Sequence, residues 1–198
     1  MDRKHFSPLP QSPLKSGATY YMPDPTMATR VSLNSPAIEV MTDLRRVGAV
    51  TVGPDTAIDI ADQSMKIHSV RALIVVDARR RVLGIITATD ILGEKPLKLT
   101  HECGFRHDEI TVQHIMTLAE RLDVIEMRDV LLADVGHVLE TLKQSARQHA
   151  LVVDQDADNR QTIRGIFSTT QIARQLGITL HTAEVGRSFA EIEAAIGP

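Results

Sequence analysis

Residues 84–90 read Gly-Ile-Ile-Thr-Ala-Thr-Asp, and residues 165–171 read Gly-Ile-Phe-Ser-Thr-Thr-Gln. Two further motifs recur in the same order, Val-Met-Thr at 40–42 with Ile-Met-Thr at 115–117, and Val-Val-Asp at 75–77 and 152–154. The offset between the copies grows from 75 to 81 residues along the chain, so one unit occurs twice with small insertions. The last insertion falls in the polar stretch 155–162, which predicts a longer hairpin tip there.

Each copy shows the same order of strand and helix signals. In the first copy a β-branched run at 49–52 ends at Gly53-Pro54, after which Asp55 or Thr56 is expected to cap a helix. Apolar residues at helical spacing follow in both copies, at 57, 60, 61 and 65 and at 135, 138, 139 and 142. Two apolar runs, 72–76 and 82–86, then predict strands, and a short helix begins near Ala88. The predicted class is α/β, with two β-α-β-β-α units packed together because neither closes a core alone.

The composition excludes several classes of function. Aromatic residues make up 3% of the 198 residues, and there is no Trp. The chain therefore lacks the aromatic side chains on which the bases of single-stranded nucleic acid would stack. The net charge of −3 argues against binding of nucleic acid, which needs an excess of Lys and Arg on one face. The single cysteine, Cys103, excludes an internal disulfide and favours the cytoplasm. The sequence shows no membrane-spanning run and no enzyme signature, so we expect a protein that is not an enzyme.

The chain ends differ from the repeated part. Six of the nine prolines lie in the first 36 residues, which predicts a flexible tail. Near the other end, Ser188 and Glu191 form a capping-box pattern, and apolar residues at 189, 192 and 196 predict a short amphipathic helix. The predicted segments are a Pro/Ser-rich tail (1–36), a first repeat (37–95), a linker (96–111), a second repeat (112–177) and a C-terminal extension (178–198).

The repeat resembles the cystathionine-β-synthase (CBS) domain over about residues 37–177. The resemblance lies in three motifs: Met-Thr at the start, Val-Val-Asp at the end of a strand, and the closing Gly-Ile-Ile-Thr-Ala-Thr-Asp. A tandem of two such domains resembles a Bateman module. The resemblance implies two repeats related by a pseudo-twofold axis, which commonly pair into a homodimer. It also implies clefts that bind an adenosine-containing ligand, AMP, ADP, ATP, NAD or S-adenosylmethionine, and signal its presence to a separate protein partner.

The first motif predicts the main cleft. Thr87 closes a strand and Asp90 lies in the next helical turn, so that a hydroxyl and a carboxylate converge where ribose and phosphate bind in the family. The alternative is that both residues only cap that helix. By resemblance, the opposite wall comes from the second copy and consists of Thr117, the strand around Ile125, Gln148 and His149.

The second motif predicts a weaker or vacant cleft. Ser168 keeps the hydroxyl, whereas Gln171 replaces the carboxylate with an uncharged amide. The resemblance places Thr42, Val50 and Arg71 opposite these two residues.

Three other interpretations remain open. The first is a scaffold without a ligand, in which the tail or the C-terminal helix recruits a partner. The second is a DNA-binding regulator, since residues 169–178 resemble half of a helix-turn-helix. The third is a zinc site among the linker side chains at 101, 103, 107 and 114, although their spacing matches no closed pattern and no metal is expected.

Overall fold

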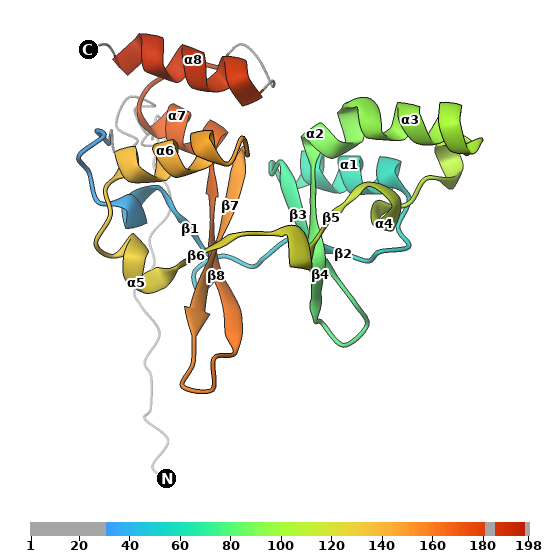
Figure 1. Cartoon of the computed structure of the whole chain (residues 1–198), viewed down its shortest axis with the longest axis horizontal. Helices are drawn as coiled ribbons and strands as arrows, with labels where there is room; N and C mark the ends of the chain where they lie inside the picture. The colour runs from blue at the N-terminus through green and yellow to red at the C-terminus, as the bar shows by residue number, and fades with distance from the viewer. Residues whose placement is uncertain (1–30, 181–184, 197–198) are drawn as a thin grey trace, which may run out of the picture.

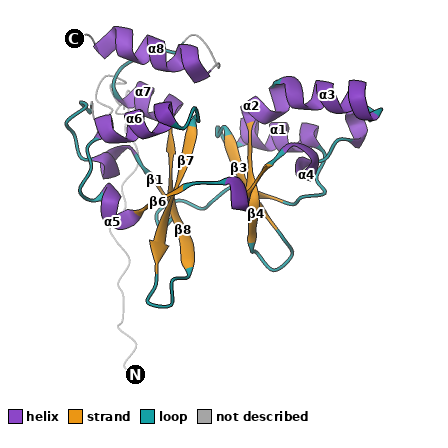
Figure 2. Cartoon of the chain, in the orientation of Figure 1, coloured by secondary structure: helices purple, strands orange, loops and turns teal. Residues whose placement is uncertain are grey.

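The computed structural model describes residues 31–180 and 185–196, so the predicted tail up to residue 30 lies outside the described residues. Two four-stranded sheets stand side by side, and helices cover the outer face and one end of each (Figure 1 and Figure 2). The two hairpins of the sheets point toward the same end of the molecule, away from the helices. No helix among the described residues is long and apolar enough to cross a membrane.

The first sheet is built mainly from the first repeat. Its strand order is β2-β3-β4-β5, with β2 parallel to β3 and the other pairs antiparallel. The strands are β2 (Thr51–Val52), β3 (Ala72–Val76), β4 (Val82–Thr87) and β5 (Thr117–Leu118). The helices beside it are α1 (Ile58–Ile67), α2 (Ala88–Leu92), α3 (Glu94–Cys103) and α4 (Val112–Ile115).

The second sheet repeats this plan in the order β1-β8-β7-β6. Its strands are β1 (Thr42–Asp43), β6 (Val124–Glu126), β7 (His149–Gln155) and β8 (Gln161–Ser168). Its helices are α5 (Met127–Val130), α6 (Val135–Gln144), α7 (Thr169–Gln175) and α8 (Val185–Ile196). The predicted α/β class and the order β-α-β-β-α in each copy are confirmed.

The fourth strand of each sheet comes from the other repeat. β5 opens the second repeat but pairs with β4 of the first, and β1 opens the first repeat but pairs with β8 of the second. Periodicity could not reveal this exchange, because each strand has only two residues. The two exchanged strands, β1 and β5, therefore connect each sheet to the other repeat.

At the start of helix α1, an amide is bound by a segment ahead of the other repeat. The predicted caps at Asp55 and Thr56 are therefore wrong. Helix α1 has Ala57 as its N-cap and no side-chain cap. The backbone N–H of Ile58 instead donates to the carbonyl of Ile110, from the segment ahead of the second repeat, at 3.1 Å. In the second repeat Val135 donates in the same way to Ser35, ahead of the first repeat, at 2.9 Å. At α1 a tertiary contact therefore satisfies an amide that the sequence assigned to a local cap.

The segment expected to be a linker at 96–111 is largely helical, since α3 occupies residues 94–103. At the other boundary, residues ahead of the first repeat are already packed, and Val31 is buried in the core of the second repeat. The C-terminal helix α8 covers that same core with Phe189 and Ile192. It begins at Val185, three residues before the predicted cap Ser188.

The insertion in the second copy lengthens the strands and leaves the turn unchanged. In both hairpins an aspartate N–H donates to the carbonyl of an arginine four residues later, Asp77 to Arg81 and Asp156 to Arg160. Between the shared Val-Val and Gly positions the second copy has four more residues, and they extend β7 and β8. The second hairpin therefore reaches further from the helices (Figure 1).

Candidate ligand-binding cleft

Thr87 and Asp90 form a reciprocal capping box at the start of α2. Asp90 Oδ2 accepts from the Thr87 backbone N–H at 2.8 Å and from Thr87 Oγ1 at 2.7 Å, and Asp90 N–H donates to Thr87 Oγ1 at 3.3 Å. The helix-capping role is therefore present. It uses one carboxylate oxygen and leaves Oδ1 for other partners.

Lys95 occupies that second oxygen. Its Nζ lies 2.5 Å from Asp90 Oδ1 and also donates to the carbonyl of Ile115 at 2.7 Å, which ties α3 to the segment that leads into β5. The lysine side chain is 46% exposed, so water screens this ion pair and the ammonium can exchange it for another anion. Sequence reasoning alone does not indicate Lys95, because most of its helix lies in the expected linker.

Beside this pair lies a cavity of about 230 Å³ with one wall from each repeat. The first repeat contributes Ile85, Thr87, Thr89 and Asp90 from β4 and α2. The second contributes residues from β5 and β7 and from the loops that lead into β6 and β7: Thr117, Leu122, Asp123, Ala146, Arg147, Gln148, His149 and Leu151. A hydrogen bond of 3.2 Å from Thr89 Oγ1 to Gln148 Oε1 connects the two walls.

Five of the six residues expected at the main cleft line this cavity, and Ile125 does not. Ile125 packs against the core of the second repeat. Side chains alternate along a strand, so its neighbour Val124 faces the space between the sheets instead. The apolar contacts in the cleft come from Ile85, Leu122 and Leu151, none of which is among the expected residues.

Arg71 belongs to this neighbourhood as well. Its carbonyl accepts from the Ala88 backbone N–H at 2.9 Å, which holds the end of β4 beside the start of β3. Its Nε is buried and has no hydrogen-bond partner among residues 31–180 and 185–196. Its guanidinium also acts electrostatically on His149, so Arg71 reaches the boundary between the two repeats.

His149 is neutral at physiological pH. Burial and, to a smaller extent, the positive charge of Arg71 lower its pKa from 6.5 to about 4, while the carboxylate of Asp90 acts in the opposite direction. The basic side chains Arg71, Lys95 and Arg147 then outnumber the carboxylates Asp90 and Asp123. The cleft is electropositive in a chain whose net charge is −3.

The pKa of His149 predicts a pH dependence of stability. Its folded pKa lies below the unfolded value, so its contribution is complete above about pH 6.5 and is lost as the pH falls toward 4. The expected loss is roughly 1–2 kcal/mol, because the ring is only partly enclosed at the cleft. Urea unfolding at pH 7 and pH 4.5 measures it. His149→Gln, which cannot titrate, should show a smaller difference, and an equal difference in both proteins would contradict the assignment.

The second cleft is less complete. Ser168 makes no side-chain cap on α7, in contrast to Thr87 on α2, and the amide oxygen of Gln171 accepts a hydrogen bond from Arg174. Thr42 pairs with Ile166, two positions before Ser168. Val50 packs against the first core and Arg71 lies beside His149, so the structure does not gather the expected set around Ser168.

The side chains considered as zinc ligands are exposed or make other contacts. His114 caps α4 through Thr111 and contacts the ring of Phe105, and Cys103 is exposed. Among the residues that the structure describes, no group of three or more His, Cys, Asp or Glu side chains is placed to hold a metal ion. The segment considered as half of a helix-turn-helix packs inward, with Ile172 and Ala173 of α7 buried in the second core.

Comparisons with known proteins agree with this architecture. Residues 37–96 match the family model of the CBS domain. An uncharacterized 17.7 kDa protein of Acidianus ambivalens is 24% identical over 142 residues, which cover 72% of this chain and 75% of the relative.

Two solved structures share the fold. An uncharacterized conserved protein from Pyrococcus horikoshii is 24% identical with a TM-score of 0.53, covering 77% of this chain and 100% of the other. A CBS-domain containing protein from Agrobacterium tumefaciens is 22% identical with a TM-score of 0.52, covering 80% and 98%. Residues 37–96 therefore belong to the CBS-domain family, and the internal repeat and the exchanged strands give the chain the fold of a tandem CBS-domain protein, a Bateman module.

Proposed function

We propose that this chain is a regulatory protein that binds an adenosine-containing nucleotide in the cleft between its repeats. The observation that carries the proposal is the cavity at Thr87 and Asp90, which joins the complete first motif to a wall from the second repeat inside an electropositive cleft. A nucleotide combines an apolar base, hydroxyls and a negative phosphate, and the cleft offers partners for each. The same motif residues bind ribose and phosphate in the family that the sequence resembles.

The contacts divide by chemistry. Leu122, Leu151 and Ile85 supply an apolar surface for a base. Asp90 Oδ1 accepts from ribose hydroxyls in a charge-assisted bond, either beside Lys95 or after Lys95 has turned away. The phosphate is held by basic side chains, because α2 has only five residues and contributes little as a helix.

Occupancy of the cleft can change how the repeats are oriented. A ligand that touches both walls favours the orientation in which both sets of contacts form, by the difference between its affinities for the two states. The partner that reads this change is a separate protein or a second copy of the chain. Exposed apolar side chains on the helices of the first repeat favour a homodimer contact there, at Ile60, Ile67, Leu92 and Leu97.

Thermal unfolding with AMP, ADP, ATP, NAD and S-adenosylmethionine tests the proposal. A ligand at 100 times its dissociation constant adds about 2.7 kcal/mol to the free energy of unfolding. For a chain of this size the midpoint should rise by roughly 5–11 °C. In Asp90→Asn, which keeps the size of the side chain, the shift should fall by more than half.

The matched control is Asp62→Asn. This substitution removes a carboxylate of α1 that pairs with Lys66 at 2.5 Å outside the cleft, and the nucleotide shift should persist. No shift with any adenosine compound would refute nucleotide binding and favour the scaffold. A shift of equal size in Asp90→Asn would place the nucleotide elsewhere.

A further inference from the structure

A second and larger cavity lies between the two hairpins, on the side of the sheets away from the helices. Its volume is about 1020 Å³, and its walls are mostly aliphatic. Ile74 and Val76 of β3 line one wall, and Leu151 and Val153 of β7, at the corresponding strand positions, line the other. Main-cleft residues Thr87, Asp90 and His149 do not line it, so the groove offers different polar groups from the cleft that it adjoins.

Positive charge is confined to one rim of the groove. Arg80 and Arg81, in the turn of the first hairpin, line it, whereas Gln161 and Thr162 face it from the second hairpin. Arg81 is already paired with Asp77, whose Oδ2 lies 2.7 Å from Arg81 Nε. Arg80 makes no hydrogen bond or ion pair that the structure shows among the described residues, so its guanidinium is available to a ligand.

The backbone at Arg80 is left-handed, with a φ of 60°. The second hairpin has the same turn, and there Asn159 takes this position with a φ of 61°. Asparagine tolerates this conformation, whereas a long side chain without local hydrogen bonding adopts it at a cost. The first hairpin thus has an arginine at a position whose backbone conformation favours asparagine. This indicates that the arginine side chain has a functional role.

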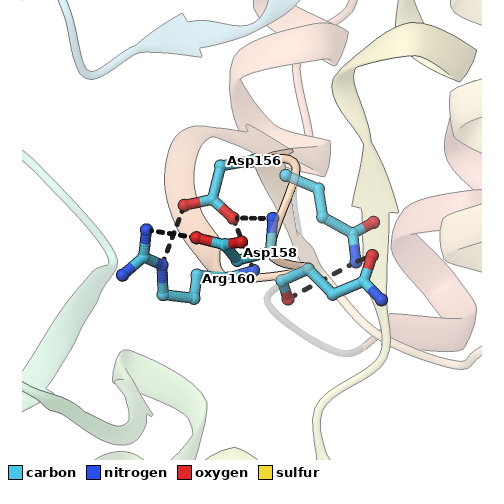
Figure 3. A network of polar contacts seen from close by, with 5 residues as sticks. Asp156, Asp158 and Arg160 are labelled. Atoms are coloured by element: carbon cyan, nitrogen blue, oxygen red, sulfur yellow. Dashed lines mark hydrogen bonds and ion pairs between the residues drawn. The ribbon is translucent and has the colours of Figure 1, made fainter.

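The second hairpin has no spare cation at its tip. Figure 3 shows Arg160 between Asp156 and Asp158, with Nε 2.9 Å from Asp156 Oδ2 and Nη2 2.9 Å from Asp158 Oδ2. The charges there are satisfied locally. A ligand anion therefore finds its partner at the first hairpin only.

We propose that this groove binds an amphipathic anion, a long acyl chain that ends in a carboxylate. The chain lies between the two aliphatic walls, where burial of its methylene groups drives binding, and the carboxylate pairs with Arg80 at the rim. The volume suits a ligand larger than a short fatty acid. Leu122 and Leu151 line both this groove and the nucleotide cleft, so each occupant contacts side chains that the other also touches.

Calorimetric titration with dodecanoate, below its micelle concentration, tests the proposal. The full chain should bind dodecanoate, and Arg80→Asn should bind it about tenfold more weakly while its midpoint of unfolding stays equal or rises. Dodecanol, which lacks the charge, should bind both proteins equally. Arg79→Asn is the matched control, because it removes a neighbouring positive charge that does not line the groove.

A second measurement follows the acyl chain directly. The chain contains no tryptophan, so Ala49→Trp places a single reporter on the exposed rim of the groove, where its emission should shift to shorter wavelength with dodecanoate and much less with hexanoate. Asp90→Asn should leave dodecanoate binding unchanged, which separates this site from the nucleotide cleft. Absent binding, an unchanged affinity in Arg80→Asn, or an equal loss in Arg79→Asn would overturn the proposal.

Discussion

Replacing Phe167 by alanine is expected to lower the free energy of unfolding by about 3–5 kcal/mol. Phe167 lies on β8, is fully buried, and is the largest of the fully buried side chains. It stands in the core that α6, α7 and α8 cover, together with Phe189 and Ile192 of the C-terminal helix. Alanine would leave a cavity that these helices cannot close completely, because α7 is held against β8 and α6 against α7.

Urea unfolding at pH 7 measures this loss, and the midpoint of thermal unfolding should fall by roughly 6–20 °C. Phe167→Leu is the control, because it keeps an apolar side chain and should cost far less. A loss below about 1.5 kcal/mol in Phe167→Ala would show that the second core collapses around the gap. The described core would then be looser than the burial of these side chains indicates.

The main features of the fold could be predicted because they are repeated. A single motif such as Gly-Ile-Ile-Thr is weak, whereas its return as Gly-Ile-Phe-Ser at a nearly constant offset fixes the register of both copies. The exchanged strands β1 and β5 could not be predicted, since two residues carry no periodicity. Nor could the partner of the first amide of α1, because the acceptor is the distant carbonyl of Ile110.

The candidate cleft could be predicted where it depends on the motif and less well where it depends on orientation. Thr117, Gln148 and His149 reach the cavity beside Asp90 because the two repeats face each other. Ile125 turns to the core, because one step along a strand reverses the side chain. Lys95 had no signal, since its ion pair with Asp90 exists only once α3 has folded.

The second large effect is expected for Gly84→Ala, which should lower the free energy of unfolding by about 3 kcal/mol. Gly84 lies on β4 opposite Leu118 of the exchanged strand β5. An added Cβ would overlap the backbone carbonyl of Thr117, and it would lie 3.2 Å from the Cα of Leu118. Backbone atoms in a paired strand cannot move aside separately, so β5 must shift as a unit.

Gly165 is the natural control, since it occupies the same position in the second repeat. There an added Cβ would meet the side chain of Met41, 2.5 Å from its Sδ and 2.8 Å from its Cγ. Methionine is flexible and can adopt another rotamer, so Gly165→Ala should change the free energy of unfolding by at most about 1 kcal/mol. Urea unfolding of both variants compares them, and equal losses would contradict the assigned contact.

The substitution at Gly84 should also affect ligand binding in the main cleft. The β4–β5 pairing places Thr117 opposite Ile85, two residues before Thr87, so a displaced β5 carries Thr117 away from the ligand side chains of the first repeat. Gly84→Ala should therefore reduce the nucleotide-induced shift of the midpoint, whereas Gly165→Ala should preserve it. Both glycines occupy the same motif position, six residues before Asp90 and Gln171, so such a difference would depend on the contact of Gly84 with the exchanged strand β5 and not on the motif itself.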